Sequence, residues 1–272
     1  MKNNNLNRPF FFLLFIVFAL GLHSCYERLD ACTDVNAANF NPTADDHCCC
    51  TYPLLRFQLE HRFGEDSIRF LLDSLYVLES GLSFRLLSLD LLAGKFYLFN
   101  ETGDSVFVEN LLDFDGDLGV NCPCRDDVFV LNPASFSASP GEIASPGEYN
   151  GLGFSTGVGS EWDGFEPADF PANHPLAGVE RYDTLSQRYF DLRASFVFPQ
   201  MGSDTLRLRS THFEEEVSFF TAFNLPRGEN KDLRLRIDYK RWFEGLDSAI
   251  PDPTQMREVL KSNFQSALLL AE

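Results

Sequence analysis

The side chains of this sequence that are best suited to binding chemistry are its cysteines and histidines. Six cysteines follow Cys25 along the chain: Cys32, Cys48, Cys49, Cys50, Cys122 and Cys124. An even number of cysteines in an exported protein predicts disulfides. Because adjacent cysteines rarely reach disulfide geometry, we expect Cys32 to pair with one member of the triplet 48–50. The other two members would then pair with Cys122 and Cys124, which would tie the N-terminal segment to the main domain.

Thiolate and imidazole are also the ligands that copper favours. The cysteines offer a copper or zinc site as the alternative to disulfides, although an oxidising compartment disfavours free thiolates. His61 falls on the apolar side of an alternating strand, which is typical of a satisfied core or interface histidine. His174 lies in an aromatic loop and His212 follows a strand, so the two could meet at one end of a domain. We name His174 and His212 as the candidate copper ligands.

A second candidate metal site is the acidic stretch D-F-D-G-D, which contains Asp113, Asp115 and Asp117. Its carboxylates resemble those of a calcium loop, but the bidentate Glu of an EF-hand does not follow at the required spacing. A weak calcium site and a solvated acidic turn are the two alternatives. The sequence has no nucleophile elbow, no H-E-x-x-H pair and no phosphate-binding glycine loop. It therefore favours a non-catalytic protein.

The N-terminus predicts export and lipidation. Two basic residues precede an apolar run over residues 9–22, which is shorter than the ~20 residues that span a bilayer and has the length of a signal-peptide core. The run ends in Leu22-His23-Ser24-Cys25, which resembles a bacterial lipobox. We expect residues 1–24 to be a signal peptide and Cys25 to carry a lipid. The lipid would hold the protein to a membrane of the cell envelope, and we expect this to be the outer membrane. An ordinary signal peptide with a structural Cys25 and an uncleaved anchor are the alternatives.

The formal net charge of −18 limits the partners of the protein. So acidic a chain is unsuited to nucleic acid and to the surface of anionic membranes. Its charge is compatible with cation binding and with plain solubility. The expected partners are therefore a membrane, through the lipid anchor, and an unknown protein or ligand.

Residues 25–53 form a small segment rich in Cys, Asn and Asp. Its asparagines are typical of Asx-turns, which fold a short stretch that has no core, and their oxygens offer calcium ligation as an alternative. Residues 31–52 are similar to a motif of secreted proteins of Bacteroidetes, C-T-D-x-x-A-x-N-[YF]-N-P-x-A followed by one Cys. The match runs through Ala44 and then departs, because a Cys triplet replaces the single closing Cys.

From residue 54 onwards the hydrophobic period is two, which indicates half-buried strands. The predicted strands are 55–63, 84–90, 95–99, 105–108, 128–131, 151–157, 189–198, 205–212, 217–223 and 233–239. Short strands separated by turn signals predict an all-β domain over residues 54–272, an antiparallel β-sandwich. Its core would be supplied by the 28 phenylalanines of the chain.

One C-terminal helix is predicted to begin at Asp252, with Pro253 as its first residue and Gln255 completing a capping box. Apolar residues then recur at four-residue spacing: Met256, Leu260, Phe264 and Leu268. Two long stretches lack periodicity. Residues 132–148 are rich in Ser, Pro and Gly and predict a surface loop. Residues 160–179 carry aromatic side chains, which predict an ordered, partner-binding loop. The aromatic residues assigned to it are Trp162, Phe165 and Phe170.

From about Leu54 to its end, the chain resembles the MbnP-like family of exported proteins associated with copper handling. The landmarks are the first strand at 55–63, residues 147–158 against G-x-Y-x-x-L-x-F-x-x-G-V, Asn173-His-Pro-Leu176, Arg181-Tyr182 leading to Tyr189, and Asn263-Phe264. The resemblance implies an all-β fold and a copper role. It also implies a histidine after the strand that follows Tyr189, a position for which His212 is the candidate.

The chain departs from the family where a W-x-W-like pair is expected. Residues 182–189 contain no tryptophan, and both Trp162 and Trp242 lie elsewhere. A copper ligand derived from tryptophan is therefore not expected. The sequence leads to two hypotheses of function. The first is an exported, membrane-anchored, non-catalytic binding lipoprotein, with copper as the ligand that the resemblance implies. The alternative is a cell-envelope module that uses the aromatic loop to hold a protein or a glycan and binds no metal.

Overall fold

The computed structural model of the chain describes residues 27–64, 68–108, 110–112, 124–202, 204–246 and 252–271. Several predicted features lie outside these residues: the signal peptide of residues 1–24, the lipidated Cys25, the candidate calcium ligands Asp113, Asp115 and Asp117, and Cys122. The main chain of Cys124 belongs to strand β8 (Cys124–Arg125), while its side chain is outside the described part. No helix among the described residues has both the length and the apolar character needed to cross a membrane.

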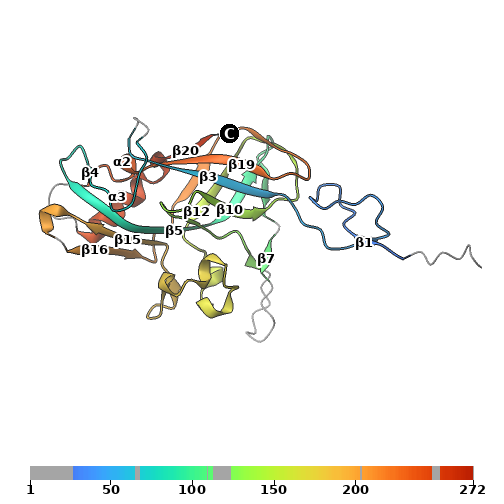
Figure 1. The fold of residues 1–272 in the computed structure, drawn as a ribbon, viewed down its shortest axis with the longest axis horizontal. Helices are drawn as coiled ribbons and strands as arrows, with labels where there is room; N and C mark the ends of the chain where they lie inside the picture. Colours follow the sequence, from blue (N-terminus) through green and yellow to red (C-terminus); the bar gives the residue numbers. More distant parts are fainter. Residues whose placement is uncertain are drawn as a thin grey trace, which may run out of the picture.

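Two β-sheets form the body of the protein (Figure 1). The first has the strand order β10 (Ser137–Glu142), β3 (Leu54–Arg62), β19 (Lys231–Asp238) and β20 (Leu268–Ala271). The second has the order β16 (Thr205–Ser210), β15 (Leu192–Val197), β5 (Ser83–Phe99), β12 (Gly151–Thr156) and β17 (Glu216–Phe219). Three short strands also pair with β5: β4 (Tyr76–Val77), β6 (Ser105–Phe107) and β9 (Phe129–Leu131).

Smaller strand pairs and short helices complete the described fold. The pairs are β1 (Asp30–Ala31) with β2 (Asp46–His47), β7 (Leu111–Leu112) with β8, β11 (Gly147–Tyr149) with β18 (Phe223–Leu225), and β13 (Tyr182–Asp183) with β14 (Arg188–Tyr189). The 3-10 helices are η2 (Ser160–Trp162), η3 (Pro167–Asp169), η4 (Pro175–Ala177), η5 (Val179–Arg181), η6 (Pro199–Met201) and η7 (Gln265–Ala267).

The two large sheets pack face to face through phenylalanine rings. The ring centroid of Phe57 in β3 lies 6.1 Å from that of Phe96 in β5 and 5.8 Å from that of Phe129 in β9. All three side chains are buried. Removing one such side chain from water is worth roughly 1.5–3 kcal/mol, so this layer of rings is a main source of stability. The predicted all-β sandwich is confirmed.

One strand pair departs from a wholly antiparallel arrangement. β3 and β19 run parallel, with Leu59 opposite Leu235. A parallel pair cannot be closed by a hairpin and requires a long connection between its strands. Here almost the whole sandwich lies between them in the sequence. Because the alternation of a strand is the same in either direction, the pattern of residues 233–239 could predict the strand but not its direction.

Strand β5 joins two predicted strands, 84–90 and 95–99, into one element of 17 residues. The joint is a bulge at Lys95, whose φ is 53° and where the register with β12 shifts. The carboxylate of Asp127 accepts hydrogen bonds from the main-chain N–H of Phe96, at 2.8 Å, and of Lys95. Burial raises the pKa of Asp127 to about 6, although these donors act in the opposite direction. The gap between the two predicted strands is therefore a β-bulge within one strand, and the hydrogen bonds to the buried Asp127 carboxylate stabilise it.

The prediction of a surface loop over residues 132–148 was wrong in part, because β10 and the start of β11 lie within it. β10 is an edge strand of the first sheet, and its register with β3 shifts between Ala138 and Gly141. Proline is tolerated at sheet edges and bulges, where its missing N–H is not needed. Pro140 therefore did not prevent a strand, although the stretch has no alternating pattern.

The predicted C-terminal helix is confirmed as α3 (Pro253–Asn263). The carboxylate of Asp252 accepts hydrogen bonds from the main-chain N–H groups of Thr254 and Gln255, which caps the helix. Met256 and Leu260 face the core. A shorter helix, α2 (Tyr239–Trp242), packs beside α3, and the indole N–H of Trp242 donates to the carbonyl oxygen of Leu260 at 2.9 Å.

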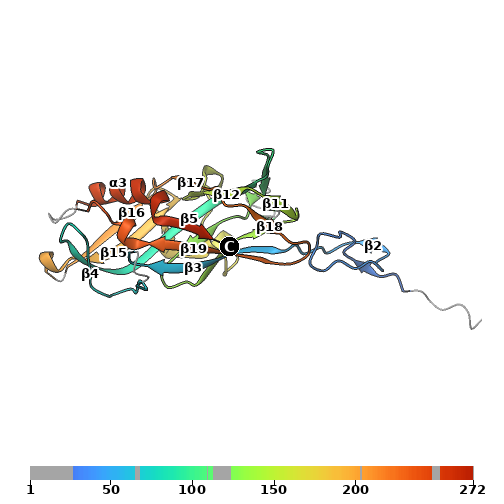
Figure 2. The same ribbon diagram turned by 90° about the horizontal axis from the view of Figure 1, so that it is seen from above.

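Residues 27–53, called the N-terminal segment below, extend from one end of the sandwich (Figures 1 and 2). A disulfide joins Cys32 to Cys50, which confirms that Cys32 pairs with the triplet. Cys48 and Cys49 are bonded to each other, so the prediction that they pair with Cys122 and Cys124 was wrong. The backbone of Cys49 adopts a positive φ of 56°, a turn that brings the two adjacent thiols together. Instead of a disulfide, hydrogen bonds such as Tyr52 N–H to the Glu142 carboxylate connect the segment to the sandwich.

Candidate functional site

A cavity of about 740 Å³ lies between strands β9 and β10 and the loop that carries η3 and η4. We call it the His174 cavity. Its polar wall consists of Asn110, Asp126, Ser135, Ser137, Ser139, Asn173, His174 and Arg181. Its apolar wall includes Leu112, Val128, Phe129, Val130, Pro171 and Pro175. The volume is within the range of about 300–1,000 Å³ that is usual for sites of small ligands.

His174 is fixed at the wall of this cavity by both of its ring nitrogens. Its Nδ1 accepts a hydrogen bond from the main-chain N–H of Leu176 at 3.1 Å, so Nδ1 carries no proton. Its Nε2 therefore carries the proton and donates to the carboxylate of Asp126 at 2.9 Å. The ring also stacks on Phe170, with 4.7 Å between the ring centroids. Only 5 % of the His174 side chain is exposed.

The aromatic loop packs on the outside of the sandwich as a second, smaller core. Trp162, Phe165 and Phe170 are between 2 % and 6 % exposed. They pack with Leu92, Val128, Leu176 and Tyr189. The loop is ordered, as expected, but its three aromatic side chains face inward and present no aromatic surface to a partner. Their role in this conformation is to hold His174 and the cavity wall in place.

His212 does not share a site with His174. It is exposed on the turn after β16 and does not line the cavity. Within the described residues, no group of three His, Cys, Asp or Glu ligand atoms contains either histidine. Both nitrogens of His174 are already engaged. The residues predicted to hold copper in the sandwich therefore do not fit a copper ion in this arrangement, and no step of function is assigned to copper there.

His61 has the role that its place in the strand predicts, that of a satisfied core histidine. Its Nδ1 lies 3.0 Å from the hydroxyl of Tyr239, and its Nε2 lies 2.8 Å from the carbonyl oxygen of Ser135. Burial lowers the pKa of this imidazole, which favours the neutral ring. The residue supports the sandwich and offers no free nitrogen.

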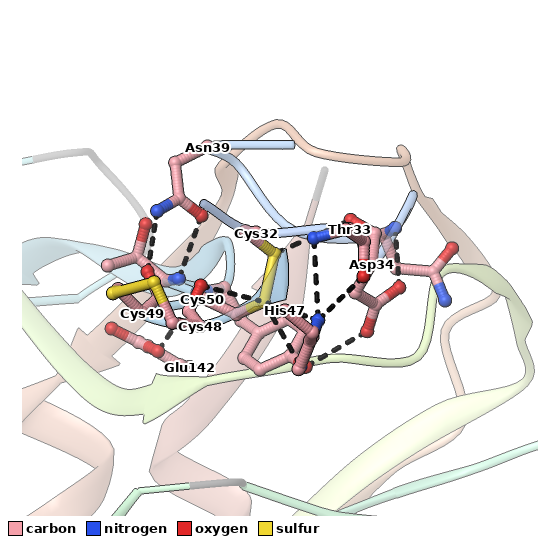
Figure 3. Close-up of a disulfide and its surroundings, with 12 residues drawn as sticks. Cys32, Thr33, Asp34, Asn39, His47, Cys48, Cys49, Cys50 and Glu142 are labelled. Atoms are coloured by element: carbon pink, nitrogen blue, oxygen red, sulfur yellow. Dashed lines mark hydrogen bonds between the residues drawn. A yellow bond between two sulfur atoms is a disulfide. The ribbon is translucent and has the colours of Figure 1, made fainter. Parts of the chain in front are cut away.

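A second grouping of ligand atoms lies in the N-terminal segment. Cys32, His47 and Cys50, called the Cys–His cluster below, place one ligand atom each within 4.8 Å of one another. The His47 ring lies beside the disulfide that joins the two cysteines (Figure 3). Metal ligation by the cysteines is one of the expectations from the sequence, but His47 is not among the ligands expected there. The signal was present in the run His47-Cys48-Cys49-Cys50, which sets an imidazole three residues before a thiol.

Two further aspartates, one in the cavity wall and one buried beside the aromatic loop, were not identified from the sequence. Asp126 is 48 residues from its partner His174, and no local pattern marks it. Asp191 is buried beside the loop, and burial raises the pKa of its carboxyl to about 6. Isolated aspartates of this kind gain their environment only from the tertiary fold.

Comparison with known proteins gives one structural likeness. The chain is similar to MbnP from Methylosinus trichosporium, with 11 % sequence identity, coverage of 81 % of this chain and 99 % of that chain, and a TM-score of 0.41. That protein bears the name of the family that the sequence landmarks resemble. The likeness concerns the fold alone, and no residue role or ligand follows from it. No family model matches the chain, and no curated protein is similar to it in sequence.

Proposed function

We propose that this chain is a non-catalytic binding protein of the cell envelope, tethered to a membrane by a lipid on Cys25. Its ligand occupies the His174 cavity and is neutral and rich in hydroxyl groups, such as a segment of a glycan. The observation that carries this proposal is a cavity of ligand size whose charged side chains are already paired within the protein.

The charges in the wall support a neutral ligand. The Asp126 carboxylate accepts the Nε2 proton of His174. The Arg181 guanidinium donates to the carbonyl oxygen of Pro175 at 2.9 Å and lies 3.7 Å from the Asp90 carboxylate. An ionic ligand would have to displace one of these partners, because a buried charge that loses its partner is costly. A ligand that exchanges hydrogen bonds with hydroxyl and amide groups meets no such penalty.

The remaining polar wall supplies groups of that kind. Ser137 and Asn173 line the cavity and are exposed to solvent, and Ser135 is partly exposed. The exposed Pro171 and the partly exposed Pro175 beside them provide an apolar surface for a sugar ring. The wall thus combines uncharged hydrogen-bonding groups with apolar side chains, and placed polar groups of this kind fix the orientation of a ligand.

The tether fits the arrangement of the chain. The N-terminal segment extends from one end of the sandwich (Figure 2) and follows Cys25 closely in the sequence, so it would serve as a spacer between a lipid anchor and the sandwich. We assign the outer membrane as the site of attachment. Incorporation of labelled palmitate into the full chain, and its loss in Cys25→Ser, tests the anchor separately from the ligand.

The ligand is tested with neutral oligosaccharides, first on an array and then by calorimetric titration of the full-length protein in detergent. Ala172 lies exposed at the rim of the cavity, so Ala172→Trp should block entry without disturbing the core. We expect a loss of affinity of at least ~10-fold. Leu185→Trp is the matched control, since Leu185 is 94 % exposed and does not line the cavity. Absence of any bound oligosaccharide, or equal affinity in the Ala172→Trp protein, would overturn the proposal.

A further inference from the structure

The Cys–His cluster lies outside the His174 cavity and has the composition of a metal site. Cys32 is buried, Cys50 is partly buried and His47 is exposed. The cluster is therefore enclosed on one side and open to solvent on the other, which gives an ion a path of entry. The N-terminal segment carries five acidic side chains and one basic side chain, and this local charge attracts cations.

The distance between sulfur and nitrogen suits a shared ion. Cys50 Sγ lies 3.8 Å from His47 Nε2. Metal–sulfur bonds near 2.3 Å and metal–nitrogen bonds near 2.0 Å place two such ligands of one ion roughly 3.5–3.7 Å apart at tetrahedral or trigonal angles. The imidazole is thus already near the required distance from Cys50 in the oxidised chain, whereas the two sulfurs, which are bonded to each other there, must move apart after reduction to bind one ion.

The imidazole is already oriented for this role. His47 Nδ1 lies 2.8 Å from the hydroxyl of Thr33. A metal-bound histidine usually donates its other N–H to such a partner, which fixes the ring. In the oxidised chain His47 Nδ1 also accepts a long hydrogen bond from the main-chain N–H of Thr33, at 3.4 Å. Binding of an ion at Nε2 therefore requires the ring proton to move to Nδ1, where the Thr33 hydroxyl oxygen accepts it.

Backbone hydrogen bonds beside the cluster also connect the segments that carry the ligands. β1 and β2 pair in parallel with Ala31 opposite His47, so Cys32 follows directly beside this pair. The N–H of Cys48 donates to the carbonyl oxygen of Ala31 at 3.1 Å, and the N–H of Asn41 donates to that of Cys32 at 2.8 Å. The first bond connects the end of β1 to the residue after β2, and the second connects Cys32 to the loop between these strands, so neither contact depends directly on the Cys32–Cys50 bond.

The number and type of ligands select the ion. Thiolates favour soft ions, among them Cu(I) and Zn(II). Structural Zn(II) almost always takes four protein ligands, whereas the cluster provides three within the described residues. Two thiolates and one imidazole suit a three-coordinate Cu(I) ion.

We propose that Cys32, His47 and Cys50 form a redox-gated Cu(I) site. In the oxidised chain the two sulfurs are bonded to each other and the site is closed. A dithiol reductant transfers two electrons and two protons to the Cys32–Cys50 bond and becomes a disulfide itself. Cu(I) then binds both sulfurs and His47 Nε2, the two thiol protons pass to solvent, and copper keeps its oxidation state. An oxidised dithiol partner takes two electrons from the two thiolates, which restores the disulfide and releases Cu(I). This inference is independent of the ligand in the His174 cavity.

The test uses the full chain with Cys25→Ser, Cys122→Ser and Cys124→Ser, so that thiols outside the triplet and Cys32 are absent. The protein is reduced anaerobically with dithiothreitol, which is then removed, and Cu(I) is titrated in competition with bicinchoninate. We expect one Cu(I) per reduced chain and none per oxidised chain. Equal copper uptake by both forms would overturn the gating, and tighter retention of Zn(II) than of Cu(I) would overturn the choice of ion.

Three variants assign the ligands. Cys48→Ser/Cys49→Ser should keep the bound Cu(I), while Cys32→Ser/Cys50→Ser, which leaves the same number of cysteines in the N-terminal segment, should lose it. His47→Ala retains both cysteines and their disulfide, and we expect its Cu(I) affinity to fall at least ~10-fold. His212→Ala is the control for loss of an exposed imidazole, and it should leave the Cu(I) affinity unchanged. Copper carried by Cys48 and Cys49, or an unchanged affinity in His47→Ala, would contradict the assigned site.

Discussion

Asp191 accepts a hydrogen bond at 2.9 Å from the main-chain N–H of Phe213, a residue 22 positions later in the chain. The same carboxyl accepts a hydrogen bond from the main chain of Val158. It is 3 % exposed and lies against Gly157. One buried carboxyl thus joins the start of the aromatic loop, the entry to β15 and the turn that carries His212. This joint explains how a long loop is held in one arrangement beside the sandwich.

Asp191→Asn should change the pH dependence of stability. Burial raises the pKa of Asp191 from 3.8 to about 6. Because the folded state holds this proton more tightly than the unfolded state, the carboxyl favours folding fully below pH 3.8 and loses that contribution as the pH rises through 6. Between pH 5 and pH 7 we expect the free energy of unfolding of the wild type to fall by about 1 kcal/mol relative to Asp191→Asn. Urea unfolding at both pH values measures this, and a constant difference would contradict it.

Gly157→Ala should destabilise the same joint. Gly157 has a φ of +81°, and an added Cβ would lie 2.7 Å from the carboxyl carbon of Asp191. We expect about 1–2 kcal/mol from the left-handed backbone and a further 1–3 kcal/mol from overpacking. Gly164→Ala is the matched control, because Gly164 has a φ of +91° but no atom within 4 Å of the added Cβ. Urea unfolding should give the larger loss for Gly157→Ala, and equal losses would mean that the close approach has no effect.

The layered fold could be predicted because burial follows the alternation of side chains. Leu55, Phe57 and Leu59 are buried in β3, as the period of two requires. The same pattern could not reveal that β3 pairs in parallel with β19, nor that residues 84–90 and 95–99 form one strand. Both depend on partners distant in sequence: a neighbouring strand in the first case and the carboxyl of Asp127 in the second.

The candidate site could be predicted less well than the fold. The loop around His174 was recognised by its aromatic content, but aromatic residues of a loop can face a partner or a core, and here they face a core. Placing His174 and His212 in one metal site requires that the loop and the end of the strand lie close together in the fold. The spacing of the two residues in the sequence cannot show this. The partner that the fold provides is Asp126, which has no distinguishing neighbours in the sequence. The pairing of Cys48 with Cys49 was missed because it needs a positive φ at a non-glycine residue.

His174→Ala should loosen the cavity wall. The change leaves the N–H of Leu176 without its side-chain acceptor and the Asp126 carboxylate without its donor. Buried polar groups that lose their partners are costly, so we expect a loss of about 2–3 kcal/mol and faster hydrogen exchange at Leu176. His212→Ala removes an exposed imidazole and should change stability by less than about 0.5 kcal/mol. Equal exchange rates in the wild type and His174→Ala would show that the histidine does not hold the loop.

Removing the Cys32–Cys50 disulfide should destabilise the N-terminal segment and leave the sandwich unchanged. The bond closes a loop between residues 18 positions apart, and loop closure of this length restricts the unfolded chain by about 3 kcal/mol. Both cysteines lie within the segment, so Cys32→Ala/Cys50→Ala should increase the rate of proteolysis of residues 27–53. The urea concentration at the unfolding midpoint of the sandwich should stay the same as in the wild type.

The matched control is Cys48→Ala/Cys49→Ala. This change removes a disulfide between adjacent residues, which closes no loop of comparable length, so we expect the segment to resist proteolysis almost as the wild type does. The comparison separates the effect of chain constraint from that of losing sulfur atoms, because each variant loses two. A lower urea midpoint for the sandwich in Cys32→Ala/Cys50→Ala would mean that the segment and the sandwich unfold as one unit. The hydrogen bond from Tyr52 to Glu142 would then transmit stability between them.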